Sequence, residues 1–241
     1  MAMLELRDVV KEYRTGKTSF KALRGVSLSI EEGEFVSIMG PSGSGKSTML
    51  HFLGFLDKPT SGEVLIAGKA MSGMDRDGLA IIRNEKIGYV FQSFNLAPTL
   101  SVAKNVELPL ILREMERPKR EAKVREMLSL VHLLPKWDNL PSQLSGGEKQ
   151  RVAIARALST DPDIILADEP TGNLDSSSGK DVMDFIYSLW KDNGKTVVIV
   201  THEPLVAEYA KRTIHIRDGN IERDVAQSGR KAEAHELKLK K

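Results

Sequence analysis

The feature that most constrains the fold of this chain is a glycine-rich connection between a strand and a helix. Residues Phe35–Met39 form a short apolar run that is typical of a buried strand, and a helix is expected from about Lys46. The connection, GPSGSGKS from Gly40 to Ser47, matches the pattern G-x-x-x-x-G-K-[ST] in the strand-to-helix context that gives the pattern its meaning. It predicts a phosphate-binding loop.

The glycines of such a loop allow backbone N–H groups to face phosphate groups. Lys46 is expected to reach the β- and γ-phosphates of a nucleotide, and the Ser47 hydroxyl is expected to bind Mg²⁺. The residues predicted to hold the nucleotide at this loop are Gly40, Ser42, Gly43, Ser44, Gly45, Lys46, Ser47 and Thr48.

Two other Gly-Lys-Thr segments serve as internal controls. Gly16–Thr18 and Gly194–Thr196 lack a glycine five residues before their own glycine, where Lys11 and Leu189 stand instead. The second also precedes an apolar strand rather than a helix. Both are predicted to be turns.

The remaining pattern predicts an α/β fold. Ile164–Ala167 and Thr196–Val200 are continuous apolar runs of strand length, as expected in a parallel sheet covered on both faces. Asp181–Lys191 is an amphipathic helical segment that Asn193-Gly194 would end. The order strand, helix, strand is that of a P-loop NTPase core with a parallel sheet.

The stretch from about residue 93 to 160 differs, because it contains helical patterns from Pro118 and after Gly147 but no convincing strand. We therefore predict an α/β core over about 1–92 and 161–224, a helical subdomain over about 93–160 and a charged tail over 225–241. Thr213–Ile216 and Asn220–Glu222 flank Asp218-Gly219 and predict a hairpin. This hairpin and the N-terminal strands could form an antiparallel side layer.

Composition excludes several classes of protein. The 241 residues contain no cysteine, which excludes disulfides, thiol catalysis and cysteine-based metal sites. No apolar run approaches the roughly 18 residues of a membrane span, and the charged start lacks a signal-peptide core. We expect a soluble, cytoplasmic protein.

The net charge of +2 gives no general basic bias toward nucleic acid. Residues 225–241 contain five basic and two acidic residues, a charge of +3, which leaves 30 basic and 31 acidic residues, a charge of −1, elsewhere. The tail is expected to be a solvated end, and contact with a membrane surface is the alternative.

A second candidate anion site begins at Leu144, in LSGGEKQRVAIARAL. A helix that starts on Ser145-Gly146-Gly147 combines small side chains, bare backbone N–H groups and a positive dipole end. One nucleotide occupies one phosphate-binding loop, so the sequence raises the question of what this second site binds.

Acidic residues and a histidine follow the predicted strands. Asp168 and Glu169 come at the end of one apolar run, where the first carboxylate of a P-loop ATPase holds the Mg²⁺ shell and the second polarises the attacking water. His202 follows the next apolar run and is a third candidate, although a histidine at a strand end is more often a capping or core residue.

Taken together, the phosphate-binding loop, the LSGG helix start and the Asp-Glu pair resemble the nucleotide-binding subunit of an ABC transporter. The resemblance covers about Leu4 to Arg223. The segments FVSIMGPSGSGKSTML, VFQSFNLAPTLSVAKNVELPL and DEPTGNLDSSSG are most similar to the lipoprotein-release, macrolide-efflux and cell-division branch.

This resemblance implies roles at the matching positions. Tyr13, after a predicted edge strand, would stack on adenine, with a surface loop tyrosine as the alternative. Gln92 would reach Mg²⁺ and the attacking water, Glu169 would be the catalytic base and His202 would contact the γ-phosphate. The loop Gly172–Asp175 would sense the other subunit's site, with Asp175 near the nucleotide. Many relatives have Ser-Ala where this loop has Gly-Asn, and aspartate where Glu203 stands; we attach little weight to either difference.

The resemblance also implies an answer for the second anion site. The start of that helix, comprising Ser145, Gly146, Gly147 and Glu148, would contact ATP held by a second copy of the chain. Two copies would meet head to tail around two ATP molecules, with binding closing the pair and hydrolysis opening it. The partners would be the second copy and separate membrane permease subunits, at the inner face of the cell membrane.

Contact with the permease is expected over Phe91–Leu110, where four apolar residues could bind a cytoplasmic helix or could equally be core residues: Phe94, Leu96, Leu100 and Val106. One alternative is an ABC ATPase that drives a membrane complex without transport. Others are a soluble ABC ATPase of DNA repair or translation, and a P-loop kinase. The insert is too short for the long arms of repair proteins, and LSGGEKQR argues against a kinase.

Overall fold

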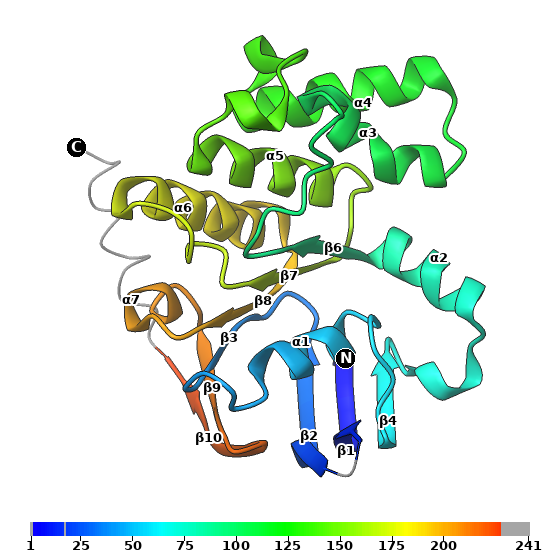
Figure 1. Ribbon diagram of the computed structural model, residues 1–241, viewed down its shortest axis with the longest axis vertical. Helices are drawn as coiled ribbons and strands as arrows, with labels where there is room; N and C mark the ends of the chain where they lie inside the picture. The colour runs from blue at the N-terminus through cyan, green and yellow to red at the C-terminus, as the bar shows by residue number, and fades with distance from the viewer. Residues whose placement is uncertain (1, 17, 228–241) are drawn as a thin grey trace. The chain divides into compact units, whose positions relative to one another are not determined.

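The computed structural model describes residues 2–16 and 18–227, and its contacts divide the chain into two compact units. The first combines residues 1–79 with 187–241, and the second comprises residues 80–186 (Figure 1). Helices α2 (Arg76–Lys86) and α6 (Ser176–Asn193) each run through a boundary between these units. The limits of a helical subdomain at residues 93 and 160 stay a prediction.

The centre of the first unit is a group of largely buried strands. Strand β3 (Phe35–Met39) pairs in parallel with β8 (Thr196–Thr201) and with β9 (Arg212–Arg217). All six residues of β8 are buried, as expected for an apolar strand covered on both faces. Two helices accompany these strands, α1 (Lys46–Leu53) and α7 (Pro204–Ala207). The predicted strands and the helix at Lys46 are confirmed.

A separate antiparallel sheet has the order β2-β1-β4-β5. Its strands are β1 (Ala2–Thr15), β2 (Thr18–Glu31), β4 (Ser61–Ile66) and β5 (Lys69–Ala70), followed by a 3₁₀ turn, η1 (Met71–Gly73). The antiparallel side layer is therefore confirmed.

The C-terminal hairpin exists but does not belong to that layer, so this part of the prediction is wrong. Strand β10 (Asn220–Ala226) pairs with β9, and β9 joins β3 in the parallel sheet. Thr213, Ile214 and Ile216 are all buried, so β9 is covered on both faces, whereas a side-layer strand would expose one. Asp218 and Gly219 both have positive φ, 47° and 78°, as a two-residue hairpin turn requires.

In the second unit, one strand precedes a group of helices along the chain and another strand follows it. Strands β6 (Ile87–Val90) and β7 (Ile164–Asp168) pair directly. Between them lie α3 (Val102–Leu112), α4 (Arg117–Leu130), η2 (Leu134–Lys136), η3 (Pro141–Gln143) and α5 (Gly146–Leu158). The helices near Pro118 and Gly147 are confirmed, and α3 was not predicted.

Helix α6 begins five residues before the predicted Asp181, because Asp175 caps it. The Asp175 carboxylate accepts hydrogen bonds from the backbone N–H groups of Ser177 and Ser178, at 3.1 and 3.0 Å. This is a helix N-cap, which favours helix formation through residues that carry no apolar pattern.

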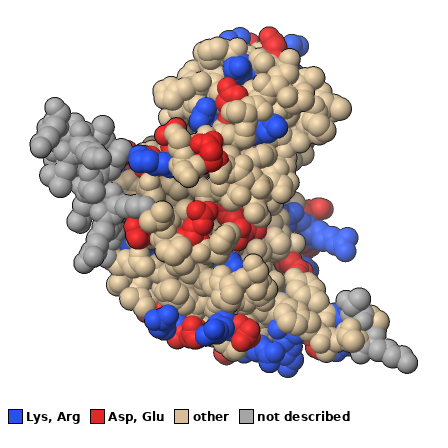
Figure 2. Space-filling model, turned by 60° about the vertical axis from the view of Figure 1, so that its left-hand side comes forward, with Lys and Arg blue, Asp and Glu red and all other residues tan. Residues whose placement is uncertain are grey.

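The face shown in Figure 2 carries both basic and acidic side chains, and neither kind covers it continuously. Within residues 2–16 and 18–227, no helix is long and apolar enough to cross a membrane. Strand β10 includes the first two residues of the predicted tail, and residues 228–241 lie outside the described part of the chain.

Candidate functional site

The phosphate-binding loop leaves β3 at Met39 and enters α1 at Lys46, as predicted. Gly45 is the N-cap of α1 and has a left-handed backbone, with φ 105°. A Cβ atom at Gly45 would lie 2.5 Å from the Ala22 carbonyl oxygen, and one at Gly40 would overlap the Ile216 carbonyl oxygen. Both positions therefore require glycine. Gly45 needs it for its left-handed backbone and for close packing, and Gly40 needs it for close packing alone.

The C-terminal hairpin holds this loop in place. The Gly219 N–H donates to the Ser44 carbonyl oxygen at 3.0 Å, and the Gly219 carbonyl accepts from the Arg24 N–H at 2.9 Å. Inside the loop, the Ser44 N–H donates to the Pro41 carbonyl at 3.2 Å. The loop is thus fixed by backbone hydrogen bonds to the hairpin and within itself.

Several polar groups of the loop suit a phosphate group. The Lys46 ammonium donates to the carbonyl oxygens of Gly40 and Pro41, both at 2.9 Å, within its own loop. The Ser44 hydroxyl is buried and has no hydrogen-bond partner among the described residues. Helix α1 has no side-chain cap and no acidic residue in its first turn, so its positive end is open to an anion.

A pocket of about 190 Å³ lies beside this loop. Tyr13 and Phe20 face each other on β1 and β2, and the Tyr13 hydroxyl donates to the Asp57 carboxylate at 3.2 Å. Two aromatic rings beside a phosphate loop can accept a nucleobase by stacking. The lining residues are Tyr13, Phe20, Ala22, Gly43, Gly45, Lys46, Ser47 and Thr48.

The predicted position of Tyr13 needs correction, and one residue of this pocket was not predicted. Tyr13 lies inside β1, which pairs with both β2 and β4, and therefore neither follows an edge strand nor stands in a loop. Phe20 was not predicted; its position opposite Tyr13 follows from the pairing of Thr15 with Thr18 around the turn at Gly16. The predicted turn at Gly16 is present, with φ 61°, whereas Gly194 directly follows the end of α6, with φ 65°.

His202 is next to the loop in sheet order. It follows β8 directly, and Thr201 of β8 is paired with Met39 of β3, after which the loop begins. The carboxyl ends of two neighbouring parallel strands thus carry His202 and Gly40, with the His202 side chain exposed. This is the edge of an α/β sheet at which ligands bind.

In the second unit, Gln92 and Glu169 are in contact. They follow β6 and β7, which are aligned with Val90 opposite Ala167, and the Gln92 Nε2 donates to the Glu169 Oε2 at 3.3 Å. Glu169 has a left-handed backbone, with φ 42°, which is uncommon for a residue with a side chain and frequent at functional sites. Asp168, at the end of β7, is half-buried.

The start of α5 differs in part from the prediction of bare N–H groups, because side chains bond the N–H groups of Ser145 and Glu148 but not those of Gly146 and Gly147. The Ser145 hydroxyl accepts from the Glu148 N–H at 3.2 Å, and the Glu148 carboxylate accepts from the Ser145 N–H at 2.8 Å. This reciprocal arrangement is a capping box. The Ser145 N–H also holds the pKa of Glu148 below its usual value, so the helix start carries a negative charge at neutral pH.

The two glycines of that start pack closely against the loop after β7 and the first turn of α6. A Cβ atom at Gly147 would lie 2.9 Å from the Ser178 hydroxyl, and one at Gly146 would lie 3.4 Å from the Asn173 carbonyl oxygen. The Ser178 hydroxyl in turn donates to the Asp175 carboxylate at 2.7 Å. The predicted binding residue Asp175 therefore has a structural role as a helix cap, independent of any ligand.

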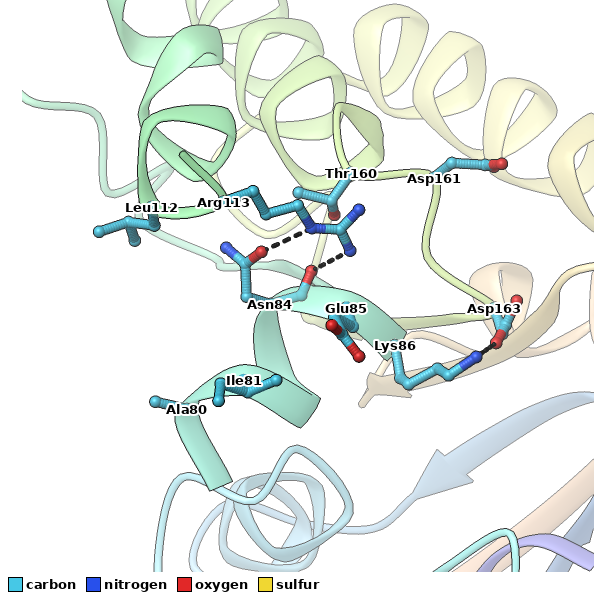
Figure 3. Close-up of a pocket in the computed structure, with 10 residues that line it drawn as sticks. All are labelled: Ala80, Ile81, Asn84, Glu85, Lys86, Leu112, Arg113, Thr160, Asp161 and Asp163. Atoms are coloured by element: carbon cyan, nitrogen blue, oxygen red, sulfur yellow. Dashed lines mark hydrogen bonds and ion pairs between the residues drawn. The ribbon is translucent and has the colours of Figure 1, made fainter. Parts of the chain in front are cut away.

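A larger hollow of about 730 Å³ lies elsewhere in the second unit (Figure 3). Its polar side chains bind one another: Arg113 donates to the Asn84 side chain at 2.7 Å, and Lys86 pairs with Asp163 at 2.7 Å. Its size exceeds that of the pocket beside Tyr13, yet it contains no glycine-rich loop. The candidate site is therefore the smaller pocket.

Among the described residues, no group of three or more His, Cys, Asp or Glu side chains could hold a metal ion. This does not conflict with a magnesium site, because Mg²⁺ bound with a nucleotide takes only one or two protein ligands besides phosphates and water. The Ser47 hydroxyl lies in the first turn of α1, where such an ion would bind beside the phosphates.

Comparison with known proteins decides the family. The sequence pattern described as "ABC transporter" matches residues 23–172. The chain belongs to the ABC transporter family of ATP-binding proteins. This ABC ATPase is 51% identical over 226 residues to an uncharacterised ABC transporter ATP-binding protein of Methanocaldococcus jannaschii, covering 92% of this chain and 96% of that protein.

A solved structure of that ATP-binding cassette, MJ0796, is dimeric and represents a post-hydrolysis state bound to ADP and phosphate. It superposes on this ABC ATPase with a TM-score of 0.87 at 50% identity, covering 93% of this chain and 98% of that one. The macrolide export ATP-binding/permease protein MacB of Salmonella typhimurium is 50% identical over 220 residues. The match covers 91% of this chain but only 34% of MacB. Both the family and the branch expected from the sequence are confirmed.

Proposed function

We propose that two copies of this ABC ATPase bind two ATP molecules between them and thereby drive a separate membrane partner. The observation that carries the proposal is the presence of two glycine-rich helix starts in one chain, at α1 and at α5. The first lies beside a pocket that Tyr13 and Phe20 line, and the second begins at Ser145 with a capping box. The second is therefore assigned to the phosphates of a nucleotide on the other copy.

Nucleotide binding at the phosphate-binding loop would use a side chain that is hydrogen-bonded within the loop when no nucleotide is bound. Lys46 would exchange the carbonyl oxygens of Gly40 and Pro41 for the β- and γ-phosphates, and the buried Ser44 hydroxyl would donate to a phosphate oxygen. Tyr13, with Phe20 opposite, would stack on adenine. Mg²⁺ would be held by Ser47, Asp168 and Gln92, and would neutralise charge on the phosphates.

Hydrolysis would use the residues at the carboxyl ends of the parallel strands. Glu169 would accept a proton from the attacking water, and Gln92, already bonded to Glu169, would orient that water. His202 would donate to the γ-phosphate. These assignments use general base catalysis and charge stabilisation, the two effects on which phosphoryl transfer depends most.

The dimer interface would contain the start of α5 and the loop before α6. Ser145, Gly146, Gly147 and Glu148 would face the nucleotide of the second copy, with Asp175 nearby. The dimeric state of the solved cassette structure supports this arrangement. A twofold pair would make both sites equivalent, and loss of the γ-phosphate would remove the contact that joins the copies.

The membrane partner is supported by MacB, which combines an ATP-binding part with a permease in one protein. We propose that this ABC ATPase meets the permease at the cytoplasmic side of the membrane. The contact would be made by Phe94, Leu96 and Leu100, which are half-buried. Val106 is fully buried and belongs to the core, so this fourth predicted contact residue cannot serve.

The decisive experiment replaces Glu169 with glutamine. The variant should bind ATP with unchanged affinity, hydrolyse it at least roughly 100-fold more slowly because the general base is lost, and accumulate as an ATP-bound dimer. Size-exclusion chromatography with Mg²⁺-ATP measures the dimer, and phosphate release measures turnover. Only monomer at all ATP concentrations, with normal nucleotide binding, would reject the proposal.

A further inference from the structure

Gly172 and Asn173 lie beside Gln92, and the proposed function places their loop at the dimer interface without assigning a contact to either residue. Both lie in the loop between β7 and α6, 80 and 81 residues after Gln92 in the sequence. The loop turns back on itself through two backbone hydrogen bonds, from Gly172 N–H to the Glu169 carbonyl and from Leu174 N–H to the Thr171 carbonyl, both at 3.0 Å. This turn presents Gly172 and Asn173 to the Gln92 segment.

Asn173 binds the backbone of Gln92. Its side-chain Nδ2 donates to the Gln92 carbonyl oxygen at 2.8 Å. Asn173 is exposed, so this hydrogen bond contributes little to the folded core, but it fixes the point from which the Gln92 side chain extends.

Gly172 makes room for the Gln92 side chain. A Cβ atom at Gly172 would lie 2.9 Å from the Gln92 Nε2 and 3.6 Å from its Cδ. The backbone of Gly172 is outside the left-handed region, so conformation does not demand glycine here. An added methyl group would therefore displace the Gln92 amide, because the atom that it meets is the end of that flexible side chain.

The same amide is the one that binds the Glu169 carboxylate at 3.3 Å. The Gly172 N–H bonds the Glu169 carbonyl, Asn173 bonds the Gln92 carbonyl, and Gln92 bonds the Glu169 side chain, so the three contacts close a ring. Such mutual support restricts side-chain motion more than any single hydrogen bond, as preorganisation of a reacting group requires.

From this geometry we infer that Gly172 and Asn173 are positioning residues that seat the Gln92 side chain against Glu169. The inference rests on the proposed function, in which Gln92 orients the attacking water and Glu169 receives its proton. Neither Gly172 nor Asn173 would touch the nucleotide in this role. Their effect on the reaction would pass entirely through Gln92.

The test is a double-mutant cycle with kcat and KM measured separately. Gly172→Ala should lower kcat about tenfold by displacing the Gln92 amide, with KM for ATP and fluorescent-ATP affinity changed less than about twofold. Asn173→Asp, which replaces the amide donor by a carboxylate oxygen, should lower kcat about threefold to tenfold. Both variants should keep the unfolding temperature of the unmodified protein.

The cycle is completed in a Gln92→Ala background. With the amide removed, Gly172→Ala has nothing to displace and should change kcat less than about twofold further. Additive effects would show that Gly172 acts by another route and would overturn the inference. So would a Gln92→Ala protein with normal kcat, or a Gly172→Ala protein that loses stability in proportion to activity.

Two matched controls separate local chemistry from general damage. Gly73→Ala adds a methyl group that meets no atom within 4 Å, at a glycine without positive φ. Asn193→Asp makes the same change at another exposed asparagine, which lies at the end of α6 and outside the proposed site. Both should retain full turnover. Absence of ATP turnover in the unmodified protein would instead reject the proposed function, and this inference with it.

Discussion

The two glycine-rich helix starts of this ABC ATPase have similar sequences and opposite local chemistry. At α1 the N-cap is Gly45, no side chain caps the helix, and the first turn has no acidic residue. At α5 the N-cap is Ser145, which forms a capping box with Glu148, so two backbone N–H groups are already bonded and a carboxylate sits on the positive end. The first end is open to an anion, whereas the second has its Glu148 N–H bonded by Ser145 and carries the Glu148 charge, so that the N–H groups of Gly146 and Gly147 are the part of this start that an anion can approach.

This difference gives the two ends different tasks. Helix α1 can accept phosphate without losing a helix cap, because only the hydrogen bonds from Lys46 to the Gly40 and Pro41 carbonyls must be exchanged. At α5, a phosphate that approaches Ser145 must compete with the cap and with the Glu148 charge. We therefore expect strong nucleotide binding at the first end and a weaker, conditional contact at the second, which suits an interface that must open in each cycle.

The largest expected effect is at α1. Lys46→Ala removes a charge-assisted contact to two phosphates and should weaken ATP binding roughly 100-fold, equivalent to about 3 kcal/mol. Fluorescent-ATP titration measures the affinity. Lys195→Ala, in the Gly194–Thr196 segment, is the control with the same sequence triplet outside the loop and should bind normally. Equal affinities for Lys46→Ala and the unmodified protein would remove α1 from the nucleotide site.

The features that could be predicted from the sequence are those whose interacting residues lie close together along the chain. The phosphate loop is contiguous, and its strand, turn and helix were all predicted from residues 35–53. The capping box at α5 also has a local signal, Ser145 followed three residues later by Glu148, but the prediction considered only the small residues and the helix dipole. That failure was one of interpretation.

Other features had no local signal. The place of β9 in the parallel sheet depends on pairing with β3, more than 170 residues away, and its own alternation fits either sheet. Phe20 enters the nucleotide pocket only through the register of the β1–β2 hairpin. The task of Gly172 depends on a side chain 80 residues earlier. Short motifs thus predicted the family, whereas long-range register decided which residues lie beside them.

A smaller effect is expected from Ser145→Ala. The change removes the acceptor for the Glu148 N–H, which costs about 1 kcal/mol of helix capping, and removes a hydroxyl from the proposed interface. In the Glu169→Gln background the ATP-bound dimer should dissociate about tenfold more readily, while ATP binding by the monomer stays unchanged. Sedimentation velocity at several protein concentrations measures the dimer equilibrium.

The matched control for that variant is Ser101→Ala. Ser101 caps α3 in the same way, accepting from the Lys104 N–H at 3.4 Å, and should lose similar stability without weakening the dimer. Equal dimer losses in the two variants would mean that capping of the helices, rather than a contact with nucleotide, accounts for the effect.

The smallest and most specific effect is expected from Glu148→Gln. Glutamine keeps the reciprocal hydrogen bonds of a capping box but removes the negative charge from the positive end of α5. If ATP phosphates approach this end, the loss of repulsion should tighten the ATP-bound dimer about threefold at low salt, and less at high salt because the charges are screened. Glu121→Gln, on the exposed face of α4, makes the same change in net charge and should leave the dimer equilibrium unaltered. A weaker dimer for Glu148→Gln would mean that the carboxylate makes a favourable contact across the interface, and the contrast between an open α1 and a self-occupied α5 would then lose its functional meaning.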